Sequence, residues 1–268
     1  MRAIFWQLVF VAGGWSHGLL DEQIEAVSRE LAQAPRDEEL LLKRAELHRA
    51  HGDYPKAKAD LERVIGGGND YAEAWFSLAR LEREAGHLPA SKVAILRFLE
   101  LGESEPRGQR EAAIIFEGLE DWKTSAKYWR DVFGNSKFLT RTAPDFEASV
   151  RVQIAAKEWA AAGVLLGEGV RKFPNAIPLI QLQGELSMTH GRWDEAHEIL
   201  QRLRGRYPTL APRLCLQEGK MWAAYRQRGR AREVWQIGLR ALNQLPALRR
   251  DQPGMVALAT ELHHLLKK

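Results

Sequence analysis

Apolar residues recur three, four and seven positions apart along most of the chain, with turn-forming residues at short intervals between them. Leu61 and Val64 are one such pair, and Leu200 and Leu203 are another. This spacing puts apolar side chains on one stripe of a helix. The pattern therefore predicts a chain of short helices, each burying its stripe against neighbouring helices.

The turn-forming segments repeat at a nearly constant period. They stand at residues 52–57, 86–91, 120–125, 157–162, 191–196 and 229–234, at spacings of 34, 34, 37, 34 and 38. Most carry a large residue followed three positions later by a small one, as in Tyr54 with Ala57. A small residue that faces another helix lets the two axes approach to about 8 Å. We interpret each period as a helical hairpin, and such hairpins stack because one alone cannot cover its stripe.

These residues resemble the tetratricopeptide repeat (TPR), a unit of two antiparallel helices joined by a tight turn. The matching first-helix pairs, bulky then small, are Leu41 with Ala45, Trp75 with Ala79, and Ile180 with Gly184. The resemblance implies an all-α, right-handed α-solenoid of about six hairpins over residues 35–242. Two hairpins depart from the family pattern. The third has Gln109 at the bulky position, and the sixth has Trp222 where a small residue is expected.

Helices outside the array are expected to cap its two ends. Residues 17–34 place Ile24, Val27 and Leu31 on one helical face before Pro35. Residues 243–268 include a last helix whose stripe is formed by Met255, Leu258, Leu262 and Leu265. We predict one cap at each end.

Residues 1–16 are typical of a signal peptide. Arg2 precedes an apolar run at residues 3–12, and small residues precede a cut after Ser16 or after Gly14. The run is shorter than the roughly 20 residues that span a bilayer. We therefore expect a periplasmic or secreted protein with no transmembrane span. The alternative is a cytoplasmic repeat adaptor that keeps these residues as its first helix.

Charge is distributed unevenly along the chain. The net charge is +4, but residues 201–268 carry fourteen Lys and Arg against four Asp and Glu. This basic quarter includes Arg202, Arg204, Arg206, Arg226, Arg228, Arg230 and Arg232. It suggests contact with an anionic surface, such as lipid headgroups or an acidic protein. Export disfavours nucleic acid, and the alternative is an ordinary solvated helix face.

Few residues indicate chemistry. The single cysteine, Cys215, excludes intrachain disulfides and cysteine-based zinc sites. His48 and His51 are three apart, but a metal site needs three or four converging ligands, and His48 falls at an inward position. No nucleophile or phosphate-loop motif occurs. We predict a non-catalytic protein without cofactor or metal; the alternative is a subunit that recruits a separately encoded enzyme.

In the TPR family the first helices line a groove that binds a partner. Carried onto this sequence, the groove residues are Leu42, Glu46, Arg49, Phe76, Arg80, Arg83, Arg110, Ile114, Arg151, Ile154 and Met188. One subfamily grips carboxylates with Lys and Asn, but Leu42 and Glu46 occupy those places here. The mixed surface suits a partner helix or extended peptide with apolar anchors and acidic residues.

Overall fold

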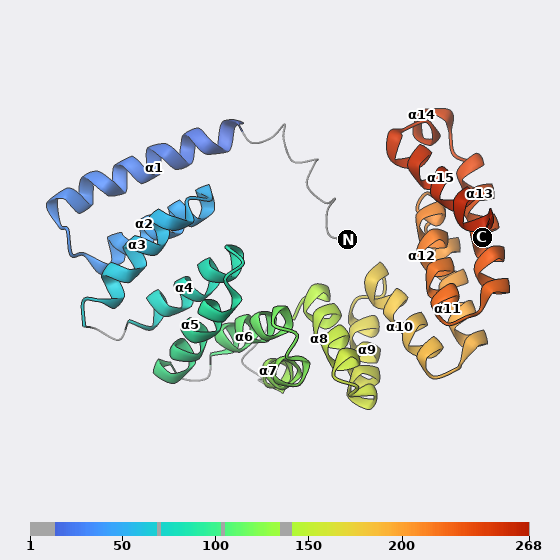
Figure 1. The fold of residues 1–268 in the computed structure, drawn as a ribbon, viewed down its shortest axis with the longest axis horizontal. Coiled ribbons are helices and arrows are strands. Elements are labelled where there is room, and N and C mark those ends of the chain that lie inside the picture. The colour runs from blue at the N-terminus through green and yellow to red at the C-terminus, as the bar shows by residue number, and fades with distance from the viewer. Residues whose placement is uncertain (1–13, 69–70, 103–104, 135–140, 268) are drawn as a thin grey trace. The chain divides into compact units, whose positions relative to one another are not determined.

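The computed structural model describes residues 14–68, 71–102, 105–134 and 141–267, except for the side chains of residues 14–18. Most of the predicted signal segment, residues 1–13, lies outside the described residues. Throughout the described ranges the backbone forms helices α1 to α15 and no strand (Figure 1). The prediction of an all-α chain of helical hairpins is therefore confirmed.

Twelve of these helices pair into six hairpins. The first helices are α2 (Glu38–His51), α4 (Ala72–Glu84), α6 (Pro106–Gly118), α8 (Ala143–Ala155), α10 (Ile177–Thr189) and α12 (Ala211–Ala224). The second helices are α3 (Tyr54–Ile65), α5 (Leu88–Leu101), α7 (Trp122–Gly134), α9 (Trp159–Lys172), α11 (Trp193–Arg206) and α13 (Arg228–Asn243). The large residues named in the sequence as turn markers, from Tyr54 to Trp193, thus open second helices.

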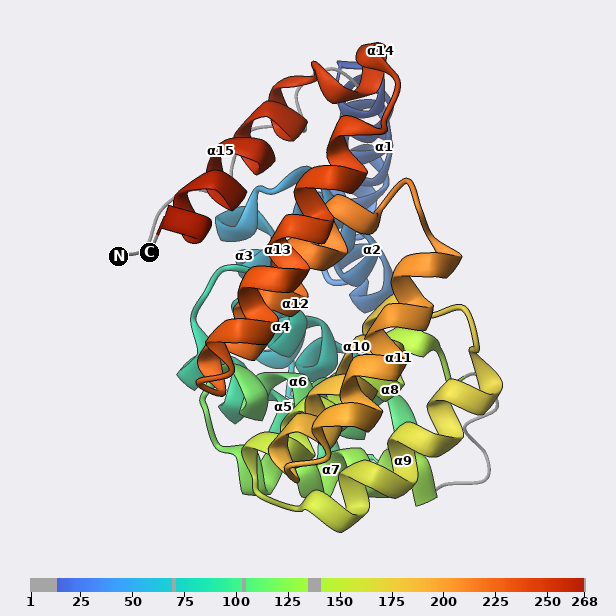
Figure 2. The same ribbon diagram turned by 90° about the vertical axis from the view of Figure 1, so that its right-hand side faces the viewer.

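The chain divides into two compact units, residues 1–140 and 141–268. In the N-terminal unit α1 (Gly14–Gln33) packs on α2, with Val27 and Leu31 buried beside Leu41. In the C-terminal unit the short α14 (Ala247–Arg250) is followed by α15 (Pro253–Lys267). Helix α15 lies beside α13 in both ribbon views (Figures 1 and 2), with Leu262 fully buried. Helices α1 and α15 therefore pack on the first and last hairpins.

Each hairpin closes on a pair of small residues twelve positions apart. On the second helix these residues are Ala57, Ser91, Ser125, Ala162, Ala196 and Ala231, all at most 1% exposed. On the first helix the partner is Ala or Gly in five hairpins and Val150 in the fourth. Where serine takes the position its buried hydroxyl is satisfied, since Ser91 Oγ donates to Ala79 O at 2.7 Å. The small side chains let the two helices approach closely.

The six turns share one backbone geometry. In each, a residue with positive φ follows the first helix: Gly52, Gly86, Glu120, Lys157, Gly191 and Arg226. In the first turn the Gly52 N–H donates to Arg49 O and the Asp53 N–H to His48 O, and the other five repeat this pair of bonds. These bonds satisfy carbonyls that a helix end leaves unpaired. One turn type therefore ends every first helix.

This geometry corrects the predicted register of the sixth hairpin. The sequence suggested a turn glycine at Gly229, but the positive-φ residue is Arg226, with φ of 60°, and Gly229 lies inside α13. The turn therefore follows Gly191 by 35 residues rather than by 38. The prediction failed because the left-handed conformation favours glycine without requiring it.

The corrected register also accounts for Trp222. The small first-helix residue of the sixth hairpin is Gly219, where an added Cβ would lie 2.1 Å from Trp235 Nε1. Trp222 stands three residues later, at the position that holds His48 and Glu82 in the first two hairpins, and it is fully buried. The expectation that Trp222 replaces the small residue is therefore wrong. The large indole of Trp235 fits against the helix because Gly219 has no side chain.

The register can be tested by replacing two glycines with alanine. Gly86→Ala should lower the free energy of unfolding by about 1 kcal/mol, because alanine is strained at its φ of 84°. Gly229→Ala should raise it by about 0.5 kcal/mol, because this glycine is helical with open space around its Cα. Denaturant midpoints measure both effects. Equal destabilisation by the two variants would place a turn at Gly229 and contradict the register.

Candidate partner-binding face

Ion pairs join the first helices of the N-terminal unit into one continuous surface, which we call the first-helix face (α2, α4 and α6). Between α2 and α4, Arg49 Nη1 lies 2.6 Å from Glu84 Oε2. Between α4 and α6, Arg83 Nε lies 2.5 Å from Glu111 Oε1. Two of the predicted groove residues, Arg49 and Arg83, thus lie at the contacts between neighbouring first helices.

An aromatic cluster lies at the middle of this face. The Phe76 ring packs against Phe98 with centroids 5.1 Å apart. The guanidinium carbons of Arg107 and Arg80 lie 4.9 and 5.9 Å from the Phe76 centroid. Arg107 also donates from Nη1 to Glu73 at 2.9 Å, and this hydrogen bonding to Glu73 raises its pKa. Phe76 is thus a partly exposed ring flanked by two cations, each within cation–π distance of its face.

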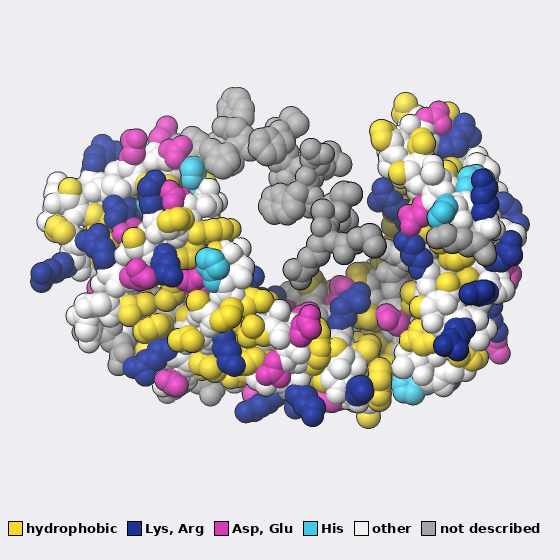
Figure 3. All heavy atoms as spheres, in the orientation of Figure 1, with side chains coloured by type: hydrophobic (Ala, Val, Ile, Leu, Met, Phe, Trp, Pro, Cys, Tyr) yellow, Lys and Arg dark blue, Asp and Glu magenta, His cyan; other side chains and the backbone are white. Residues whose placement is uncertain are grey.

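The other predicted residues of this unit lie on the same helices. Leu42 and Ile114 are partly buried, and Arg110 is partly exposed and engaged within the chain. Glu46 pairs with Arg49 at 2.9 Å and more loosely with Arg80 at 4.0 Å. Figure 3 shows hydrophobic side chains gathered on a face of this unit over α2 to α5, with Lys and Arg among them. An acidic partner must therefore compete with carboxylates that already hold the arginines.

The predicted residues of the C-terminal unit are less uniform. Arg151 is exposed and pairs with Glu147 one turn away, and Ile154 is partly buried. Met188 is 1% exposed and packs in the core cluster with Trp222 and Cys215. Assigning Met188 to a binding surface is therefore wrong, because its apolar side chain turns into the aromatic core of the last hairpins.

The basic quarter is partly occupied by contacts within the chain. Arg204 is buried, with its guanidinium on Glu218, and so it is not part of an exposed basic surface as suggested. Arg230 donates to Trp193 O at 3.1 Å and to Asp194 at 2.7 Å. Arg232 donates to Leu266 O at 3.1 Å. Binding to an anionic surface stays a prediction, carried by the remaining exposed arginines.

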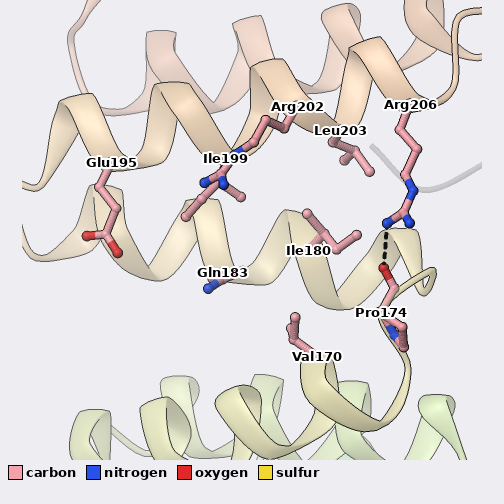
Figure 4. Close-up of a pocket in the computed structure, with 9 residues that line it drawn as sticks. All are labelled: Val170, Pro174, Ile180, Gln183, Glu195, Ile199, Arg202, Leu203 and Arg206. Carbon is pink, nitrogen blue, oxygen red and sulfur yellow. Dashed lines mark hydrogen bonds between the residues drawn. The ribbon is translucent and has the colours of Figure 1, made fainter.

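A cavity that the sequence did not predict lies between α9, α10 and α11 (Figure 4). Its volume is about 340 Å³. It is lined by Val170, Pro174, Ile180, Gln183, Glu195, Ile199, Arg202, Leu203 and Arg206. The sequence does differ here from the next hairpin boundary, because Gln183 and Val170 occupy the positions that hold Glu218 and Arg204 there. The sequence alone does not show that this difference opens a cavity, because it does not show which helices are neighbours.

Two titratable groups singled out in the sequence, His48 and Cys215, are buried. Desolvation lowers the pKa of His48, which favours the neutral imidazole at the core position predicted for it. Burial raises the pKa of Cys215 to about 11, so its thiol is protonated and a poor nucleophile at neutral pH. Among the described residues no three His, Cys, Asp or Glu side chains gather as metal ligands, and no helix is long and apolar enough to cross a membrane.

The comparisons with known proteins agree with this architecture. The tetratricopeptide repeat family model matches residues 39–66, which cover most of α2 and α3. The C-terminal part of a TPR repeat-containing protein from Cytophaga hutchinsonii superposes with a TM-score of 0.65 at 12% identity, over 91% of this chain and 95% of that one. The chain therefore has the fold of tetratricopeptide-repeat proteins, and its first hairpin matches the model of that family. A search of curated sequences finds no match to it.

Other solved TPR proteins share the fold at low identity. One from Parabacteroides merdae has a TM-score of 0.60 at 12% identity, over 92% of this chain and 94% of its own. YrrB, described as a TPR protein with an unusual peptide-binding site, has a TM-score of 0.53 at 17% identity, over 76% and 97%. At such identities the likeness establishes the fold alone.

The ion pairs of the first-helix face contribute unequally to stability. Arg83→Ala should lower the free energy of unfolding of the protein by about 1–3 kcal/mol, because Glu111, 6% exposed, loses its partner. Arg151→Ala should change it by less than about 0.5 kcal/mol, because its pair is solvent-exposed. Denaturant midpoints measure both. Adding Glu111→Gln should recover part of the loss, and no loss in Arg83→Ala would contradict a structural role.

Proposed function

We propose that this protein is a non-catalytic scaffold that binds a segment of a partner protein on its first-helix face. The observation that carries the proposal is the Phe76 cluster, a partly exposed ring flanked by Arg80 and Arg107 on consecutive first helices. An apolar partner side chain gains from covering the ring. Partner carboxylates reach arginines already held in place, which lowers the entropy lost on binding.

The ion-pair network determines what kind of partner fits. Arg49, Arg83 and Arg107 each face a carboxylate of a neighbouring helix at 2.9 Å or less. A purely acidic peptide would therefore have to break existing pairs to bind them. A partner with an apolar anchor and interspersed carboxylates gains from the ring and from shared hydrogen bonds. We propose an amphipathic helix or an extended segment of this composition.

We further propose that the protein acts in the bacterial-type envelope or is secreted, with residues 1–16 as its signal. The support is the basic, apolar and small-residue order of that segment. Helix α1 begins at Gly14, so a cut after Ser16 removes only its first turn. The buried contacts that α1 makes through Val27 and Leu31 lie beyond the cut.

Partner binding can be tested by changing Phe76, Arg80 and Arg110 together to alanine. We expect at least tenfold weaker capture of the natural partner from host extract, which corresponds to the loss of about 1.4 kcal/mol or more. Val93→Ala is the control, because Val93 is 65% exposed on α5, away from this face. Circular dichroism melts verify that the triple variant is folded. Capture of the same partner at equal yield would exclude the first-helix face.

Export can be tested on protein isolated from its native host. We expect the intact mass of a chain that begins at His17, or at Trp15 if the cut follows Gly14. The matched control is an Ala12→Gln and Gly14→Gln double variant, which should retain the segment because large side chains block the cleavage site. A native chain that keeps residues 2–16 would support the cytoplasmic alternative.

A further inference from the structure

We propose that the groove between α9 and α11 is a second protein-binding site, which takes a peptide segment with one large apolar side chain next to carboxylates. The groove lies in the C-terminal unit, on helices other than those of the first-helix face. Either site can therefore fail experimentally without the other.

The floor of the groove is apolar and incompletely filled. Ile180 of α10 and Val170 of α9 are partly exposed into the cavity, while Ile199 and Leu203 of α11 form its buried side. The volume of about 340 Å³ is at the lower end of the range for small-ligand sites. It holds one or two large side chains. Filling it would remove apolar surface from water, which favours an apolar anchor.

The next hairpin boundary shows what fills this space elsewhere. Arg204 and Glu218 occupy the positions that correspond to Val170 and Gln183, counted from the small residue of each helix. There the two charges form a buried ion pair, and Trp222 Nε1 also donates to Glu218, at 3.1 Å. Here the shorter, uncharged side chains leave the space open. At the next boundary the buried ion pair therefore fills the space that is open here.

The rim of the groove carries positive charge along α11, with Arg206 at one end (Figure 4). Arg202 and Arg206 are both exposed on α11 and stand four positions apart, which is about 6 Å along the helix. Arg206 Nη1 donates to Pro174 O at 3.0 Å, which holds the guanidinium over that end and leaves its other donors available (Figure 4). Glu195 lies at the opposite end and pairs with Arg192 at 3.0 Å. The positive charge of Arg202 and Arg206 therefore favours a peptide with carboxylates next to its apolar side chain.

The chemistry favours a peptide over an alkyl carboxylate. Gln183 places its amide, which both donates and accepts hydrogen bonds, on the wall between the apolar floor and the rim (Figure 4). A peptide backbone can use both functions, whereas a fatty-acid chain would leave the amide facing hydrocarbon without a partner. Two arginines one turn apart also match two carboxylates better than one.

The test uses a display library of random peptides of about 12 residues, enough to follow α11 from Glu195 to Arg206 as a helix. The library is selected on the full-length chain after depletion on Val170→Trp, which fills the cavity. We expect selected peptides with Leu, Met or Phe within four residues of Asp or Glu. The strongest, synthesised with a fluorescent label, should bind Arg202→Glu/Arg206→Glu at least tenfold more weakly than the unaltered chain.

The control is Arg226→Glu/Arg228→Glu, which makes the same charge change on exposed arginines outside the groove. Binding to it should be unchanged, and melting curves should show all variants folded. If Val170→Trp is unfolded, a depletion on Arg202→Glu/Arg206→Glu replaces it. Equal weakening by both charge-reversed variants would show a non-specific charge effect and overturn the proposal. Selection of no groove-dependent peptide overturns it too, and binding of sodium laurate in its place would assign the groove to a lipid.

Discussion

The close approach of two helices at a pair of small residues is the constraint on which each hairpin depends. Ala57 and its equivalents are at most 1% exposed because the partner helix lies directly over them. A larger side chain there would separate the two helices and shift the whole first helix. The position of each first-helix surface therefore depends on buried small residues that do not themselves lie on that surface.

The shared turn geometry keeps the same register in every hairpin. Because the same two backbone bonds end each first helix, equivalent residues appear at equivalent places on consecutive helices. Ion pairs then form across the boundaries, as between Arg49 and Glu84 or between Arg83 and Glu111. These pairs order long side chains before any partner arrives. Disrupting the face therefore costs stability.

The boundaries between hairpins differ in the side chains that fill their interior. The second binding site is proposed at the boundary where these side chains leave a cavity. Arg204 and Glu218 close one boundary with a buried ion pair, while Val170 and Gln183 leave its neighbour open. The backbone repeat tolerates both because hairpin closure depends on the small residues. Side chains at the boundary are free to vary, and one such variation creates the cavity.

The sequence by itself determined the hairpins, because the large and small residues that pack within each one lie close together in the sequence and recur at a nearly constant spacing. It placed Tyr54, Trp122, Trp159 and Trp193 at the starts of second helices and His48 in the core. Only the tertiary structure decided the turn at Arg226, because an arginine adopts the left-handed conformation there and no glycine marks the position in the sequence. It alone decided that Met188 is buried and that an open groove lies beside Arg206. Those outcomes depend on which side chains meet across helices, and sequence spacing carries no direct record of such contacts.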